Sequence, residues 1–310
     1  MSEYESFAKV YDLFMDNIDY DAWCRDLVGA LRKFGVDDGL VCELGCGTGS
    51  MTERLAAAGY DMIGIDSSIE MLNIAEEKKQ VHSPEVNDET RQDRISDEDM
   101  PDMDTAMYKS HDILYLCQDM REFELYGTVR AVVSVCDSMS YILEEEDMLQ
   151  VLKLVNNYLD PGGVFLFDLN TENYFRKIGD STVAENREEG SFIWDNFYDE
   201  EEKVNEYDLT LFLPQDEKKQ QAVGADLDEN HSGNRKKQQT GLTLYQKYQE
   251  QHVERAWSAE EIRQLVEQAG LEFIGAIEAF THKPVSEDSD RICIAAREIH
   301  KIPGQPGKLR

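Results

Sequence analysis

Short apolar runs alternate with helical spacings between residues 40 and 170 of the chain. The runs predict five strands, at 40–44, 61–65, 112–117, 129–135 and 164–167. Between them, apolar residues recur at spacings of three and four over 50–58, 69–79 and 148–159, which predicts helices with one buried face. Strands that are apolar nearly throughout and that alternate with helices are typical of a parallel sheet covered on both faces.

The pattern changes on both sides of this region. Upstream, apolar residues from Trp23 to Phe34 form the stripe of an amphipathic helix that packs onto the sheet. Downstream, 190–213 and 241–256 predict antiparallel strands, with the acidic stretch 199–203 as a hairpin turn.

The C-terminal part returns to the alternation of helix and strand. Ser258 and Glu261 have the spacing of a capping box that opens a helix, and Gly270 is expected to end it. Two further strands are expected at 273–279 and 291–296.

Composition disfavours several classes of partner. The 310 residues include 31 Lys and Arg against 64 Asp and Glu, a net charge of −33, which disfavours nucleic acid and anionic membranes because their phosphates are also negative. The chain has no apolar run of about 18 residues and no signal-peptide pattern at its start, so we expect a cytosolic protein. Six scattered cysteines without metal-ligand spacing favour free thiols and predict no metal site.

A glycine-rich turn, Glu43-Leu44-Gly45-Cys46-Gly47-Thr48-Gly49, follows the first predicted strand. Glycines let the backbone come close to a ligand, and the start of the next helix offers free N–H groups. Asp66 ends the second predicted strand 19 residues after Gly47, where a carboxylate can accept hydrogen bonds from both hydroxyls of a ribose. The pair predicts a cofactor that contains a nucleoside.

Two common nucleotide-binding motifs do not fit this turn. A dinucleotide fingerprint requires a small closing Gly or Ala where the chain has Ser50, and no G-x-x-x-x-G-K-[ST] sequence is present. Glu43 could instead hold the loop, or bind an amino group of the ligand directly or through water.

Four segments in order resemble class I S-adenosylmethionine-dependent methyltransferases. They are the turn at 43–49, Asp66 after Ile63-Gly64-Ile65, Cys117-Gln118-Asp119-Met120, and Leu159-Asp160-Pro161-Gly162-Gly163. The opening Tyr4-x-x-Phe7-Ala8-x-Val10-Tyr11-Asp12 resembles a subgroup of small cytosolic members. The resemblance implies an α/β fold with a doubly wound, mostly parallel seven-strand sheet of Rossmann-like type and a small antiparallel lid inserted after strand five.

The same resemblance implies a division of the chain. It comprises an N-terminal helical cap at 1–39, a cofactor-binding core at 40–170, an antiparallel substrate lid at 171–256, a C-terminal helix and strands at 257–300, and a tail at 301–310. Two polar segments, 80–109 in the core and 215–239 in the lid, are expected to be mobile insertions.

The resemblance also implies roles for single residues toward S-adenosylmethionine. Gly45, Gly47 and Gly49 would line its methionine part, Asp66 would bind the ribose, Asp119 would accept from the adenine amino group, Met120 would lie against the adenine, and Glu43 would hold the loop or an amino group. Tyr11 would fold over the cofactor, and Asp137 would lie near the sulfonium.

Asp137, His252 and Tyr11 are therefore the candidate catalytic residues. An amine acceptor must be neutral to attack, and a carboxylate such as Asp137 or an imidazole such as His252 could remove its proton. Each also has a structural alternative, because Asp137 could cap a turn, Tyr11 could pack in the core and His252 could lie at the surface.

The sequence thus predicts methyl transfer to a nitrogen or oxygen of a small molecule. The lid, together with Tyr141, Asn170 and Tyr174, is expected to recognise this acceptor. The alternatives are an RNA or protein methyltransferase, a non-catalytic S-adenosylmethionine sensor or assembly factor whose acidic insertions recruit a basic partner, and a dehydrogenase. The oligomeric state is left open.

Overall fold

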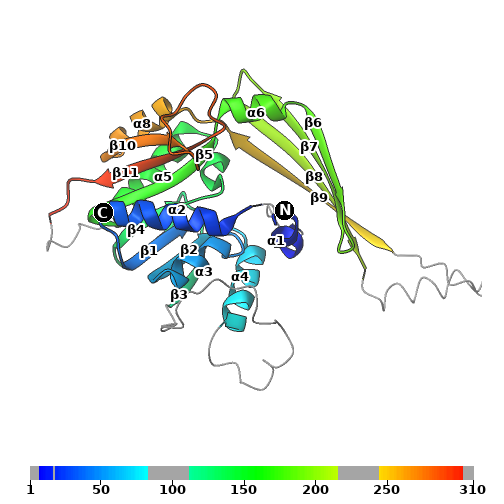
Figure 1. Cartoon of the computed structure of the whole chain (residues 1–310), viewed down its shortest axis with the longest axis horizontal. Coiled ribbons are helices and arrows are strands. Elements are labelled where there is room, and N and C mark those ends of the chain that lie inside the picture. The colour runs from blue at the N-terminus through cyan, green and yellow to red at the C-terminus, as the bar shows by residue number, and fades with distance from the viewer. Residues whose placement is uncertain (1–6, 17, 83–111, 216–243, 303–310) are drawn as a thin grey trace, which may run out of the picture.

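The computed structural model describes residues 7–16, 18–82, 112–215 and 244–302. Within these ranges the larger of two sheets has seven strands in the order β3-β2-β1-β4-β5-β11-β10 (Figure 1). The strands are β1 (Gly39–Leu44), β2 (Tyr60–Asp66), β3 (Ile113–Cys117), β4 (Val129–Ser134), β5 (Leu159–Asn170), β10 (Leu271–Glu278) and β11 (Arg291–Glu298). β11 is antiparallel to both neighbours, whereas β1 to β5 pair in parallel, so the predicted fold class is confirmed.

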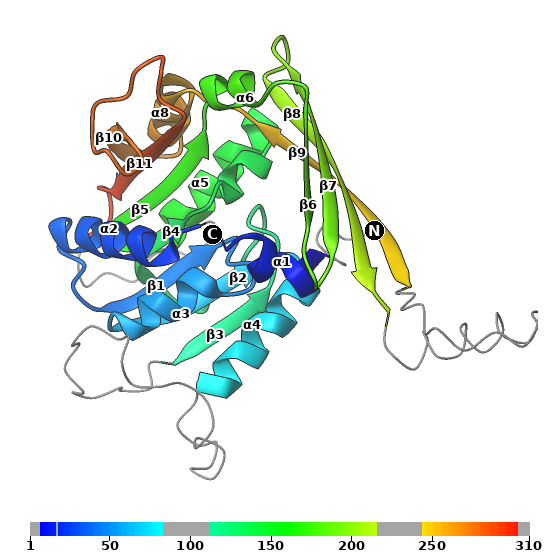
Figure 2. The ribbon, with the colours of Figure 1, turned by 45° about the vertical axis from the view of Figure 1, so that its right-hand side comes forward.

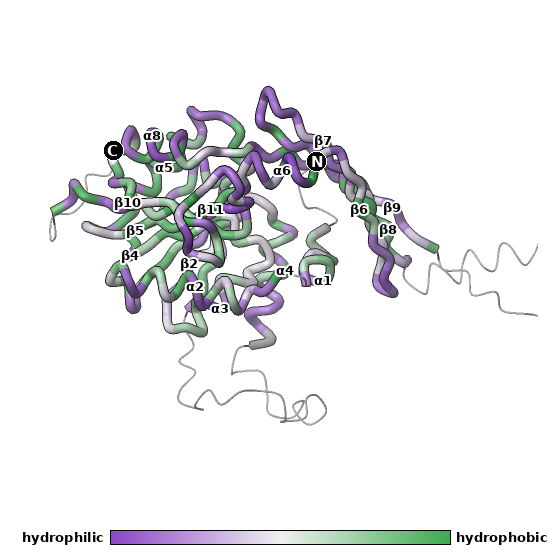
Figure 3. The backbone as a smooth tube through the Cα atoms, turned by 45° about the horizontal axis from the view of Figure 1, so that its top comes forward, coloured by the Kyte–Doolittle hydropathy of each residue, from purple (hydrophilic) through white to green (hydrophobic). Residues whose placement is uncertain are grey.

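Helices cover both faces of this sheet because alternate strand residues point to opposite sides. Cys42 and Leu44 of β1 face α5 (Glu145–Tyr158) and α8 (Ala259–Gln268), whereas Val41 faces α2 (Tyr20–Lys33) and α3 (Ser50–Ala57). The side chains buried on the two faces are mostly aliphatic and aromatic. Figure 3 shows the strands of this sheet as mainly hydrophobic and the helices around it as more hydrophilic. The predicted capping box at Ser258 and Glu261 is confirmed at the start of α8.

Two predicted boundaries in the core were wrong. α4 (Ile69–His82) continues through the first residues of the segment expected to be an insertion from residue 80. The rest of that insertion, 83–109, lies outside the described residues. β5 begins at Leu159, not 164, because Leu159 pairs with Val129 and the register then shifts before Ala131. The Pro-Gly-Gly sequence that suggests a turn therefore forms an irregular strand start.

The smaller sheet follows β5 and is wholly antiparallel, as predicted for the lid. It contains β6 (Ser181–Asn186), β7 (Ser191–Asp199), β8 (Val204–Pro214) and β9 (Tyr245–Arg255) in sequential order. The hairpin turn expected at 199–203 joins β7 to β8. Residues 216–243, which include nearly all of the predicted insertion at 215–239, lie outside the description.

One helix and one strand at the start of the lid were not predicted. α6 (Glu172–Ile178) is short and begins at Thr171, whose hydroxyl accepts from the Tyr174 N–H. β6 is exposed along most of its length, so it lacks the alternation that marks a half-buried strand. β6 forms a strand because its backbone pairs with β7.

The N-terminal segment joins the two sheets. It contains the 3-10 helix η1 (Phe7–Val10) and α1 (Tyr11–Phe14), which lie between the core and the lid (Figure 2). The Asp12 carboxylate accepts from Thr48 Oγ1 at 2.6 Å and Lys78 Nζ at 2.8 Å, and Phe14 packs edge-on against Phe192 of the lid at 4.9 Å.

None of the helices in the described ranges has the length and apolar character that crossing a bilayer demands. Cytosolic location and the division of the chain into five parts stay predictions. The same holds for the N-terminal subgroup pattern, whose Tyr4 lies outside the described residues.

Candidate active site

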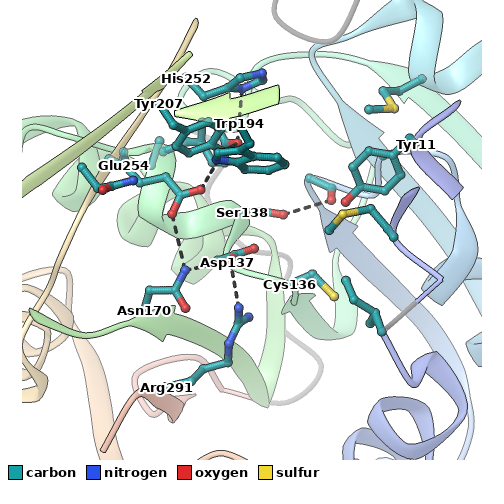
Figure 4. A pocket seen from close by; sticks show the side chains of 18 of the residues that line it. Tyr11, Cys136, Asp137, Ser138, Asn170, Trp194, Tyr207, His252, Glu254 and Arg291 are labelled. Atoms are coloured by element: carbon teal, nitrogen blue, oxygen red, sulfur yellow. Dashed lines mark hydrogen bonds and ion pairs between the residues drawn. The ribbon is translucent and has the colours of Figure 1, made fainter. Parts of the chain in front are cut away.

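A cavity of about 1160 Å³ lies where the carboxyl ends of the core strands meet the lid and the N-terminal segment (Figure 4). The strand order reverses between β1 and β4, which is the position where open α/β sheets bind ligands. The glycine turn and Asp66 line one side of this cavity, and Trp194, Tyr207 and Glu254 of the lid line the other.

Gly45 and Gly47 bring bare backbone to the cavity, each with positive φ (70° and 53°). A Cβ on Gly45 would lie 2.5 Å from Ser138 Cβ, so no larger residue fits. A Cβ on Gly47 would meet no described atom within 4 Å, which indicates that this position faces open space. Gly49 is not among the lining residues, and its Cβ would overlap the Tyr115 hydroxyl, so its observed role is packing at the start of α3.

Asp66 connects the end of β2 to the glycine turn. Its Oδ2 accepts from the Gly47 N–H and its Oδ1 from the Ser68 N–H, both at 2.8 Å. Burial raises the pKa of Asp66, and these backbone hydrogen bonds oppose the shift because they favour the carboxylate. The carboxylate lines the cavity, where a ribose contact is predicted.

Glu43 lies behind the turn, only 2% exposed, and accepts a hydrogen bond from the Thr52 hydroxyl of α3. Burial raises its pKa to about 8, although the Thr52 bond works in the other direction. Glu43 lines a small recess beside Gly45 and Gly47 and not the large cavity. Its position suits the predicted role of holding the loop.

Asp119 and Met120 follow β3 and line the same side of the cavity. The Asp119 carboxylate accepts from Arg121 Nε at 3.0 Å and from the Arg121 N–H at 2.8 Å, and the Arg121 hydrogen bonds lower its pKa. The Met120 methyl lies 3.5 Å from the Cβ position of Gly45, so its thioether lies beside the glycine turn.

Asp137 lies three residues after the end of β4, next to Ser138, whose hydroxyl donates to the Gly45 carbonyl. It has φ = 60°, and its Oδ2 accepts from Asn170 Nδ2 at 2.7 Å and Arg291 Nη2 at 2.8 Å. Arg291 also donates to buried Asp168 at 2.5 Å. Arg291 and Asp168 were not identified from the sequence, because they lie on β11 and β5, which only the sheet pairing brings next to Asp137.

Glu254 is a second functional candidate that sequence reasoning missed. It is 6% exposed on β9 and accepts from Tyr207 Oη at 3.0 Å and Asn170 Nδ2 at 3.4 Å. Burial raises its pKa, and the nearby negative charge of Asp137 adds to the shift. The one available signal was its spacing of two from His252, which places both side chains on one face of a strand.

His252 is not a surface residue but 1% exposed, within a stack of aromatic rings in the lid. Its ring lies 4.9 Å from Tyr207, which in turn lies 4.7 Å from Trp194. His252 Nδ1 is 3.3 Å from Tyr141 Oη. All four rings line the cavity. Trp194, Tyr207 and His252, which Figure 4 labels, form an aromatic wall on the lid side, and Tyr141 meets His252 edge-on.

Tyr11 lines the cavity from the N-terminal segment, across from the lid (Figure 4). Burial raises its pKa well above the ordinary value, so its hydroxyl stays protonated. Asn170, Tyr141 and Tyr174, which the sequence predicts to read the acceptor, also line the cavity. The structure thus brings all the candidate catalytic residues into one space.

Comparison with known proteins shows the family of this chain. A family model for the methyltransferase domain matches residues 17–275. The chain belongs to the S-adenosylmethionine-dependent methyltransferases of class I. The dehydrogenase alternative has no support from this match, because the family is defined by methyl transfer.

Two relatives match this chain over different lengths. YqeM of Bacillus subtilis (strain 168), named as a methyltransferase, is 28% identical over 301 residues, covering 96% of this chain and 98% of YqeM. A dTDP-3-amino-3,4,6-trideoxy-alpha-D-glucopyranose N,N-dimethyltransferase from Streptomyces venezuelae is 25% identical over 52% of this chain and 56% of its own.

A solved structure shows the same fold. The S-adenosylmethionine-dependent methyltransferase from Clostridium acetobutylicum ATCC 824 superposes with a TM-score of 0.70 and 22% identity, covering 96% of this chain and 99% of its own. This likeness concerns the fold and leaves the acceptor open.

Proposed function

We propose that this methyltransferase binds S-adenosylmethionine between the glycine turn and Met120 and transfers its methyl group to a nitrogen or oxygen of a small molecule held by the lid. The observation that carries the proposal is the single cavity, which the predicted cofactor residues line on one side and an aromatic, carboxylate-bearing wall lines on the other.

The residues present fit the cofactor. Gly47 offers bare backbone toward open space, the Asp66 carboxylate suits a ribose diol, and the Met120 thioether suits the face of an adenine. Bound S-adenosylmethionine supplies a methyl group activated by the neighbouring sulfonium.

The protein then has to align the acceptor with the methyl group and exclude water. Alignment raises the rate of methyl transfer through proximity and orientation. Tyr11 and the N-terminal segment cover the cavity, held to the core by Asp12 and to the lid by Phe14. Asp137 stays in the proposal as a catalytic group. Its Oδ2 is occupied by Arg291 and Asn170, which leaves Oδ1 for the acceptor.

His252 is placed to act through its neighbours. Its Nδ1 lies near Tyr141 Oη, and Tyr141 Oη is 2.5 Å from Tyr207 Oη, so a proton can move along this chain of polar groups. In the proposal, His252 sets the orientation of these hydroxyls or takes a proton through them.

The charge of the cavity favours a neutral or cationic acceptor. Its described lining contains nine carboxylates and three arginines and no lysine: Asp16, Asp19, Asp66, Asp119, Asp137, Glu144, Asp147, Glu185 and Glu254, with Arg121, Arg187 and Arg291. Each arginine already binds two carboxylates. A diphosphate, as in the dTDP-sugar of the Streptomyces relative, would meet no spare cation here.

The same charge argument disfavours RNA, whereas a peptide acceptor with a free amine is the remaining alternative. Titration calorimetry with S-adenosylmethionine, S-adenosylhomocysteine and NAD tests the cofactor. We expect binding of both sulfur ligands and not of NAD, and release of S-adenosylhomocysteine when an acceptor is supplied. If neither S-adenosylmethionine nor S-adenosylhomocysteine bound, the proposal would be wrong.

A further inference from the structure

The lid side of the cavity has more buried hydrogen-bond acceptors than donors. Asp137, Asp168 and Glu254 place three carboxylates around one guanidinium, that of Arg291. Arg291 binds Asp137 and Asp168, and the described residues show no ion pair to Glu254. Within the described ranges, Glu254 accepts hydrogen bonds from the neutral donors Tyr207 and Asn170. A buried carboxylate without a cation is costly, and burial accordingly raises the pKa of Glu254 and favours its protonated form. A positively charged group bound beside Glu254 would stabilise the carboxylate.

Asn170 provides an independent observation. The residue is 1% exposed and lines the cavity, and its Oδ1 has no hydrogen-bond partner among the described residues. Its amide orientation follows from the contacts, because Nδ2 donates to both Asp137 and Glu254, where an oxygen would be repelled. Oδ1 is therefore an orphaned acceptor, and burying such an atom without a donor is unfavourable.

A second orphaned acceptor lies nearby on the lid. Asn205 Oδ1 of β8 is buried, lines the cavity and has no partner among the described residues. Two amide oxygens without a described donor and one carboxyl group without a described cation thus lie beside the aromatic wall of Trp194 and Tyr207. Aromatic faces attract cations as well, because the ring quadrupole is negative on its face.

An ammonium group matches this set. It carries a positive charge for Glu254 and three N–H donors for oxygen acceptors, and it can lie against an aromatic ring. An alcohol has a single donor and no charge, and a carboxylate or phosphate has none. We propose that the acceptor of this methyltransferase is an amine that enters as its ammonium ion and is recognised by Glu254 together with Asn170. One N–H proton of the ammonium then passes to the Asp137 carboxylate, which leaves the nitrogen neutral and able to accept the methyl group. This inference rests on the proposed function, because it names the acceptor class of the same cavity.

Three molecules of similar shape test the inference with the full-length chain. They are 2-phenylethylamine, 2-phenylethanol and 3-phenylpropanoate, titrated into protein saturated with S-adenosylhomocysteine at pH 7.5. We expect the amine to bind at least about tenfold more tightly than the alcohol, because hydrogen bonds to charged groups contribute roughly that much or more. The carboxylate should not bind.

The variant Glu254→Gln keeps the shape of the side chain and removes its charge. It should abolish the preference for the amine and leave affinity for S-adenosylhomocysteine unchanged, which shows that the variant is folded. Glu144→Gln, the same change at an exposed carboxylate on the cavity rim, should keep the preference. Together the two variants separate a specific partner from the general negative charge.

The outcomes distinguish this inference from the proposed function. Failure of S-adenosylhomocysteine to bind would remove the cofactor proposal itself. Normal cofactor binding with equal affinity for amine and alcohol, or with no amine binding, would overturn only the acceptor class. An amine preference that survives in Glu254→Gln would overturn the assignment to Glu254.

Discussion

The two sides of the active-site cavity are built in different ways. On the cofactor side, Glu43, Gly45, Gly47 and Asp66 come from one strand-turn-helix unit and the strand beside it. On the acceptor side, Asp137, Asn170, Glu254 and Arg291 come from four elements. The first side depends on local backbone geometry, whereas the second depends on how two sheets meet. Mutations on the acceptor side should therefore lower mainly the stability of the protein, and mutations on the cofactor side should lower mainly its affinity for the cofactor.

The largest effect is expected on the acceptor side. Arg291→Gln leaves Asp137 and Asp168 without their cation, so the free energy of unfolding should fall by about 3–5 kcal/mol. Urea denaturation measures this. Arg263→Gln, which removes an arginine from an exposed pair with Glu260, should change stability little. Equal stabilities for the two variants would show that the buried cluster is not held by Arg291.

The cofactor side should respond in affinity more than in stability. Asp66→Ala should weaken S-adenosylmethionine binding by about 1.5–3 kcal/mol, since it removes a charge-assisted contact and the Asp66 hydrogen bond to Gly47. Calorimetry gives the dissociation constant. Asp61→Ala, at the exposed start of the same strand, is the control. Unchanged affinity in Asp66→Ala would exclude Asp66 from the cofactor site.

Glu43 should make stability depend on pH. Its folded pKa of about 8 lies above the ordinary value of 4.5, so the folded state holds a proton that the unfolded state has lost between these pH values. Stability should therefore fall as pH rises through this window, by up to about 1.4 kcal/mol per pH unit. Glu43→Gln should reduce this slope by the contribution of Glu43, and Glu254, whose pKa burial also raises, should maintain the remainder. Glu260→Gln, at the surface, should leave the slope unchanged. Parallel curves for Glu43→Gln and the wild type would contradict the prediction.

The smallest effect is expected where the N-terminal segment meets the core. Asp12→Asn weakens the bonds to Thr48, Ser50 and Lys78 at a partly exposed site, so the affinity for S-adenosylmethionine should fall by about 1 kcal/mol or less. Amide hydrogen exchange in α1 should become faster. Asp21→Asn, which alters an exposed pair with Arg54, should leave both quantities unchanged. A loss as large as that in Asp66→Ala would make Asp12 a direct cofactor residue.

The comparison also explains which sequence predictions succeeded. The apolar runs and capping signals predicted the strands and helices of the core, because the spacing of apolar residues along a segment reflects which of its positions are buried. Errors arose where pairing overrode local preference, as in β5, whose Pro-Gly-Gly start forms part of a strand. β6 had no periodicity to detect, since it is exposed and held by β7 alone.

The sequence by itself determined the fold class, the family and the glycine turn with Asp66, because these depend on short segments whose geometry is local. Only the tertiary structure decided that Glu254, Asn170 and Arg291 meet Asp137, and that His252 is buried in an aromatic wall. Those contacts join residues up to 154 positions apart. Their energy comes from burial and charge that arise only when the lid packs against the core, and no local spacing encodes them.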